Sequence, residues 1–138
     1  MAPVNPMQQY QQQVINTATP GMVTVMLFEE IIKNINLASK AIDEQNIQDS
    51  HDTLVKAQNI YLTLGNFLDE RFEISKHLLR MYEYLASRLI DANMKKDKSI
   101  LQEVMEFTVE FRDTWRQAEK NLHIEQTGGM ISQNIGQV

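Results

Sequence analysis

The sequence predicts an all-α protein, an antiparallel up-and-down four-helix bundle with an N-terminal arm or short helix packed on it as a cap. Residues 20–122 contain only one proline and two glycines, so little opposes helix formation. Apolar residues recur there at steps of three and four in four successive stretches, whereas strand-type alternation is missing. Short connections between such stretches make sequential helices antiparallel neighbours.

The first two helices are predicted over residues 20–44 and 47–70. Thr19 followed by Pro20 is typical of a helix N-cap with proline at the first helical position. Asn46, with Asp49 three residues later, marks the second start. The first stripe consists of Phe28, Ile31, Ile35, Ala38 and Ile42, and the second of Leu54, Ala57, Tyr61, Leu64 and Leu68.

The other two helices are predicted over residues 74–93 and from Asp97, the fourth N-cap, to Leu122. No Gly or Pro separates the second and third helices, but the stripe loses phase between Leu68 and Ile74, which favours a turn over one continuous helix. The third stripe consists of Ile74, Leu78, Met81, Leu85, Leu89 and Ala92. The fourth consists of Leu101, Val104, Thr108, Phe111, Trp115, Ala118 and Leu122.

This pattern divides the chain into an arm over residues 1–19, a bundle over 20–122 and a tail of uncertain order over 123–138. The arm has two prolines and a glutamine cluster, and the tail has three glycines. A chain of 138 residues is long enough to bury the core of one domain without a covalent or metal cross-link.

Composition excludes several classes of protein. The chain has no cysteine, which excludes disulfide scaffolds, thiolate catalysis and Cys-ligated zinc. Its net charge of −5 argues against a nucleic-acid surface. No apolar run approaches the ~18 to 20 residues of a membrane span, so we expect no direct membrane insertion and a cytoplasmic protein.

No pattern in the sequence indicates catalysis, a cofactor or a metal. His51, His77 and His123 are isolated from one another, and none follows a Glu at the spacing of a di-iron bundle site. Neighbouring carboxylates such as Glu29 and Glu30 are typical of a solvated helix face. We therefore expect no enzyme activity.

Apolar residues exceed one stripe per helix. Most of the surplus is expected in the core, because core-facing helices use about three positions per heptad. Leu62 and Phe67 flank the second stripe on opposite sides, so burying both would need a very wide covered face. We therefore expect these two side chains at the surface, where they could form an apolar groove for a partner helix.

The chain resembles the flagellin-specific export chaperones of the FliS family from about Met7 to Ala118. The resemblance rests on several short motifs in the family's order. These motifs are Tyr10 with Val14, Thr17-Ala18-Thr19-Pro20, Met26-Leu27-Phe28, Ser50-His51-Asp52-Thr53-Leu54-Val55-Lys56-Ala57-Gln58, Leu68-Asp69, Met81-Tyr82-Glu83-Tyr84-Leu85, Arg88-Leu89 with Ala92-Asn93, and Phe111-Arg112-Asp113-Thr114-Trp115.

The resemblance implies a cytoplasmic helical bundle that holds the disordered C-terminal segment of flagellin, prevents premature polymerisation and delivers it to a membrane protein of the flagellar export gate. It also implies that the N-terminal arm covers the binding surface when the client is absent. We expect a monomer or weak dimer. The candidate cap and groove residues are Met7, Tyr10, Val14, Met26, Leu62, Phe67 and Phe107.

The sequence departs from the family pattern at several positions. Met22 stands where the glutamate of a capping box is common, Phe28 replaces a usual tyrosine, and Thr108 interrupts a usually apolar stripe. The main alternative function is a self-associating helical structural or adaptor protein, whose contacts would include Leu62, Phe67 and Phe72. An enzyme built on the bundle is a further alternative.

Overall fold

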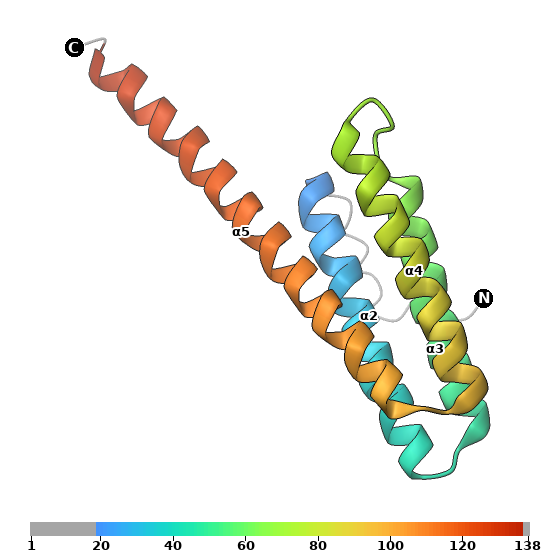
Figure 1. Cartoon of the computed structure of the whole chain (residues 1–138). Coiled ribbons are helices and arrows are strands. Elements are labelled where there is room, and N and C mark those ends of the chain that lie inside the picture. Colours follow the sequence, from blue (N-terminus) through green and yellow to red (C-terminus); the bar gives the residue numbers. More distant parts are fainter. Residues whose placement is uncertain (1–18, 137–138) are drawn as a thin grey trace, which may run out of the picture. The chain divides into compact units, whose positions relative to one another are not determined.

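The computed structural model describes the backbone of residues 19–136 and the side chains of residues 19–125. Within those residues the protein has four helices and no strand, which confirms the predicted all-α fold class (Figure 1). The helices are α2 (Pro20–Asp43), α3 (Ile47–Asn66), α4 (Glu73–Lys95) and α5 (Lys98–Gly136). The predicted N-terminal cap lies outside the described residues.

The chain divides into two compact units. We call residues 26–112 the central unit, and residues 19–25 with 113–136 the described part of the terminal unit. The helices α2 and α5 each contribute to both units. The predicted bundle of residues 20–122 is thus distributed over both units, and the division into arm, bundle and tail stays a prediction.

The predicted N-caps are confirmed. The backbone N–H of Met22 donates to Thr19 Oγ1 at 3.2 Å, and that of Asp49 donates to Asn46 Oδ1 at 3.1 Å. Asp97 accepts from the backbone N–H of Ser99 at 2.8 Å. Each side chain satisfies a first-turn donor that has no carbonyl partner within its own helix.

The predicted turn between the second and third helices is also confirmed, and α3 ends at Asn66 rather than near residue 70. Asp69 holds this turn, because its carboxylate accepts from the backbone N–H of Arg71 at 3.0 Å and from the Arg71 guanidinium. Such a side-chain to backbone bond competes with helix and stabilises a turn without Gly or Pro.

Four aromatic rings, one from each helix, form the centre of the core in the central unit. Neighbouring rings have centroids 5.5 to 6.4 Å apart, in edge-to-face, tilted or stacked arrangements. The four are Phe28, Tyr61, Tyr82 and Phe111. Phe28 has no exposed surface. It stands where the family usually has tyrosine, and because phenylalanine has no hydroxyl, no buried polar atom at this position needs a hydrogen-bond partner.

The predicted stripe of α4 is wrong at two positions. Ile74 and Met81 are 65% and 36% exposed, whereas Tyr82 is buried in the aromatic cluster. The buried side is thus shifted by one residue in the first half of α4, to Ser75 and Tyr82, whereas Leu85, Leu89 and Ala92 are buried as predicted. Burying an aromatic side chain removes more apolar surface from water than burying a methionine, which favours this orientation.

The stripe of α5 is buried only in part. Leu101, Val104 and Thr108 are buried in the central unit, but Ala118 and Leu122 of the terminal unit are exposed. The helix itself runs beyond Leu122 to Gly136, so most of the segment predicted as a tail is helical.

Candidate functional site

The part of the chain that the structure describes contains no cluster of metal-ligating side chains. None of its helices has an apolar stretch long enough to cross a membrane. Large apolar side chains remain at the surface, among them Leu62, Phe67 and Phe72, and polar contacts join the helices.

Leu62 and Phe67 are exposed, as predicted, at 47% and 59% of their surface. They are five positions apart around the end of α3, which places them roughly 140° apart on a helix of 3.6 residues per turn. Between them, Tyr61 and Leu64 point into the core and are buried. The two exposed side chains therefore lie on different flanks of α3.

The flank that carries Leu62 packs beside α4. A Cβ atom placed on Gly65 would lie 3.0 Å from Leu79 Cδ1, so the glycine permits a close approach of the two helices. At the other end of the pair, Asn93 Nδ2 and His51 Nδ1 are 3.0 Å apart and share a hydrogen bond. As α3 advances from 51 to 65, α4 returns from 93 to 79, which makes the pair antiparallel and in register.

On the side of α4 next to this flank of α3 lie Leu79, Ala86 and Ile90. They recur at steps of seven and four and therefore share one side of the helix. Leu79 and Ile90 are exposed, and Ala86 between them is buried. We call the surface formed by Leu62, Gly65, Leu79, Ala86 and Ile90 the α3–α4 face. Gly65 stands at the contact between the two helices, Ala86 is buried, and the large apolar side chains of Leu62, Leu79 and Ile90 are exposed.

The sequence did not single out Leu79. The predicted apolar stripe for this helix contains Leu78, and the adjacent Leu79 was given no role. Leu79 is three turns before Ile90 on α4, since eleven residues bring a helix back to nearly the same side. Leu79 and Ile90 therefore belong to a second apolar stripe on α4, and this stripe was the sequence signal that could have identified Leu79.

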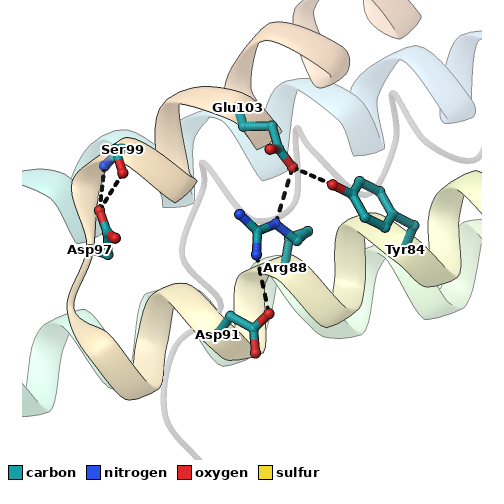
Figure 2. Close-up of polar contacts among 6 residues, drawn as sticks. All are labelled: Tyr84, Arg88, Asp91, Asp97, Ser99 and Glu103. Carbon is teal, nitrogen blue, oxygen red and sulfur yellow. Dashed lines mark hydrogen bonds and ion pairs between the residues drawn. The ribbon is translucent and has the colours of Figure 1, made fainter.

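A polar network joins α4 and α5 in addition to the aromatic contact between Tyr82 and Phe111. Glu103 Oε1 on α5 accepts from the Tyr84 hydroxyl at 2.8 Å and from Arg88 Nε at 3.1 Å, both on α4 (Figure 2). Arg88 also reaches Asp91 at 3.3 Å. The bond from Tyr84 and the adjacent Arg88 guanidinium hold the pKa of the Glu103 carboxyl below its ordinary value. This network fixes the position of α5 along α4.

Beyond Leu62 and Phe67, the predicted site residues that the structure describes lie on helices other than α3. Phe107 is half-buried and lies one turn beyond Glu103 on α5, and Met26 is half-buried on α2. The three remaining candidates, Met7, Tyr10 and Val14, lie outside the described residues. The full set of site residues therefore stays a prediction.

A cleft of about 260 Å³ lies between α2 and α3. Its lining consists of Leu37, Lys40, Ala41, Glu44, Asp49, Asp52 and Thr53. None of the predicted site residues lines it. Its acidic rim distinguishes it from the α3–α4 face.

The described residues form a helical bundle with a filled aromatic core, and they contain no cluster of metal-ligating side chains. Large apolar side chains remain at the surface of this bundle. Such a surface is typical of a protein-binding module. The family model described as "Flagellar protein FliS" matches residues 3–122 of this chain. The chain therefore belongs to the FliS family.

Relatives agree with this assignment, and a solved structure agrees with the fold. The chain is 42% identical to the flagellar secretion chaperone FliS of Bacillus subtilis over 118 residues, which are 86% of this chain and 89% of that protein. It is 28% identical to FliS of Escherichia coli over 78% of this chain and 81% of the relative. A crystal structure of a bacterial flagellar chaperone has the same fold, with a TM-score of 0.70 over 85% of this chain and 99% of that one at 18% identity. These relatives are named chaperones, and the protein is not an enzyme.

Proposed function

We propose that this protein is a cytoplasmic flagellar secretion chaperone. It binds the disordered C-terminal segment of flagellin on exposed apolar surface of the bundle, prevents premature polymerisation and delivers the segment to a membrane protein of the flagellar export gate. The names of its relatives support the chaperone role, and the apolar surface supports the kind of client.

The observation that carries the proposal is the coexistence of a filled core with exposed apolar side chains. Phe28, Tyr61 and Tyr82 are almost completely buried, so the bundle does not need Leu62 or Phe67 to complete its interior. Large apolar side chains left in water are unfavourable unless a partner covers them. An amphipathic client segment would cover them by laying its own apolar stripe along the α3–α4 face.

The energetics suit a client that must later be released. Fully burying one Leu or Phe side chain is worth roughly 1.5 to 3 kcal/mol, whereas ordering a disordered segment on binding costs about 2 to 5 kcal/mol. Several such contacts are therefore needed to hold the segment, and the net affinity stays well below the gross contact energy. Polymerisation is blocked because the client's apolar stripe cannot face the chaperone and a neighbouring flagellin at once.

In the proposed mechanism, residues 1–18 compete with the client for the apolar surface that binds it. Met7, Tyr10 and Val14 are spaced by three and four, so a helical turn would place them on one face. A tethered segment acts at an effective concentration of order mM, so even a weak contact with the client surface competes with a free client. In this mechanism the arm covers the client surface when the client is absent, and the client displaces the arm when it binds.

The proposal is tested by mixing the full-length chain with purified flagellin and with flagellin lacking its C-terminal segment. We expect a one-to-one complex with the intact flagellin only, and a fall in sedimentable filament when polymerisation is triggered in its presence. Equal binding to the truncated flagellin would contradict the proposed client segment. Self-association of the chain without any flagellin binding would instead favour the structural or adaptor function, and light scattering after size exclusion would reveal it.

A further inference from the structure

The cleft of about 260 Å³ between α2 and α3, which we call the α2–α3 cleft, combines an apolar lining with a charged one. All of its lining residues belong to the central unit. Leu37 and Ala41 form the apolar part, one turn apart on α2. Ala41 is buried, whereas Leu37 is 45% exposed. The cleft therefore offers water-exposed apolar surface beside its charges.

The charged lining of the cleft is mainly acidic. The carboxylates of Glu44, Asp49 and Asp52 line it together with a single ammonium group, that of Lys40. Asp49 and Asp52 each accept a hydrogen bond from a neutral side-chain amide, which leaves their charge in place. Among the residues that the structure describes, Glu44 has no ion-pair partner. The chain itself therefore leaves an excess of negative charge in the cleft.

The turn that follows α2 holds these groups in place without a ligand. The backbone N–H of Asn46 donates to the carbonyl oxygen of Ala41 at 2.8 Å, which closes the end of α2. Asp43, next to Glu44 in the chain, pairs with Lys98 at 2.9 Å. The cleft is therefore preformed, and a ligand that enters it needs little reordering of the chain.

The size and the chemistry of the cleft select the same kind of ligand. Pockets for drug-sized molecules have volumes of about 300 to 1,000 Å³, so this smaller cleft fits one side chain better than a whole cofactor. Arginine joins an apolar stem to a planar guanidinium group that binds carboxylates through two parallel hydrogen bonds. The stem matches Leu37, and the guanidinium group matches Glu44 and Asp52. Lysine carries the same charge but lacks the planar group.

We propose that the α2–α3 cleft is a binding site for an arginine side chain of a protein partner, which the chain binds in addition to its client. Arginine is among the residues that most often anchor protein interfaces. The net charge of −5 opposes a second copy of this chain as the occupant and favours a basic partner. The cleft shares no residue with the apolar α3–α4 face, so this inference does not depend on the proposed function.

Three substitutions separate the charge of the cleft from its apolar surface. Glu44→Gln and Asp52→Asn remove a charge but keep the shape of the side chain and an acceptor oxygen. Leu37→Ala removes the apolar contact for the stem. The matched control is Glu83→Gln, which removes an exposed carboxylate on α4 outside the cleft. Asp49 is left unchanged because it stands in the first turn of α3, where a carboxylate stabilises the helix.

The site is tested by titrating a blocked alanine–arginine–alanine tripeptide into the ¹⁵N-labelled full-length chain and following the backbone amide signals. We expect weak but saturable shifts confined to residues 37–53, about threefold weaker binding of the lysine tripeptide, and no binding of the tripeptide with neutral citrulline. Glu44→Gln, Asp52→Asn and Leu37→Ala should each weaken binding about threefold, and the double charge variant about tenfold. Circular dichroism shows whether each variant stays folded.

Three results of the titration would overturn the proposal. The first is a set of shifts that does not saturate or that spreads over acidic surface outside the cleft. The second is an equal loss of binding in Glu83→Gln. The third is unchanged binding in Leu37→Ala, which would reduce the cleft to a diffuse attraction between charges.

The protein partner is tested by selecting a phage-displayed library of random peptides on the full-length chain. Peptides that also bind the Glu44→Gln, Asp52→Asn double variant are removed in each round. We expect the remaining peptides to be enriched in arginine at one position, whereas enrichment without arginine would overturn the proposal. Self-association of the chain that the double variant abolishes, measured by light scattering, would identify a second copy as the occupant and contradict the proposed partner.

Discussion

Thr108 on α5 is the hydrogen-bond partner of Tyr61 on α3, and both side chains are fully buried. Thr108 Oγ1 donates its proton to the carbonyl oxygen of Val104 at 2.7 Å, so the Tyr61 hydroxyl is the donor in the bond between the two side chains. Burial raises the pKa of the Tyr61 phenol above its ordinary value. A threonine that interrupts an apolar stripe in the sequence thus satisfies a buried phenol in the structure.

The Thr108→Val substitution tests this pairing. It keeps the side-chain shape but leaves the buried Tyr61 hydroxyl without its partner, which should lower the free energy of unfolding by about 1 to 3 kcal/mol. Urea unfolding followed by circular dichroism measures the change.

The Tyr61→Phe substitution provides the second half of a double-mutant cycle. In the Thr108→Val background it removes the unpaired hydroxyl, so it should recover part of the lost stability. Strictly additive losses would show that the two hydroxyl groups are not coupled.

The network around Glu103 predicts a pH-dependent stability. The folded-state pKa of Glu103 lies below its ordinary value of 4.5, so its contribution is present above about pH 4.5 and is lost as the pH falls through the folded-state pKa. Glu103→Gln should therefore lower the urea midpoint at pH 7, and the gap to the wild type should shrink by pH 3. The control is Glu110→Gln, an exposed carboxylate on the same helix. A gap that grows toward pH 3 would contradict the assignment.

Residue spacing predicted the four helices and three N-caps because these depend on local chemistry. Thr19, Asn46 and Asp97 each act on backbone groups two or three residues away, so neighbouring sequence contains the signal. The end of α4 was predicted at residue 93 and lies at Lys95, where the following Lys96 adopts the left-handed conformation at φ 49° in a position where glycine is usual.

Contacts between helices were harder to predict. The sequence gives no indication that Glu119 meets Gly21, or that Tyr82 rather than Met81 faces the core, since both outcomes depend on how separate helices pack. The exposure of Leu62 and Phe67 was predictable because the width of one stripe limits what a single helix is able to bury. Leu79 was not found, although its spacing from Ile90 on the same helix was a signal, because its close approach to Gly65 depends on how two helices pack.

The Leu62→Ser substitution tests the α3–α4 face as the client surface. Because Leu62 is about half exposed, its loss should hardly change the unfolding midpoint but should weaken binding of the flagellin C-terminal peptide by about five- to tenfold. Ile47→Ser is the matched control, since Ile47 is also exposed on α3 but lies at its first residue. Equal losses in both variants would show that the face does not select the client.

Removal of residues 1–18 tests competition by the arm. If the arm covers the surface ten times out of eleven, its deletion should raise client affinity about tenfold, equivalent to ~1.4 kcal/mol. In the full-length chain, Tyr10→Ala should raise the affinity if Tyr10 only covers the surface, and lower it if Tyr10 also contacts the client. Unchanged affinity in both proteins would remove the arm from the mechanism.

The central claim is that a bundle with a filled core binds a disordered flagellin segment on its remaining apolar surface. Calorimetry of the full-length chain with a synthetic peptide from the C-terminus of the host's flagellin tests it most directly. The account predicts one-to-one binding with a negative heat-capacity change, together with a gain in helix by circular dichroism. A peptide that produces no heat of binding and no gain in helix at any concentration tested would contradict it.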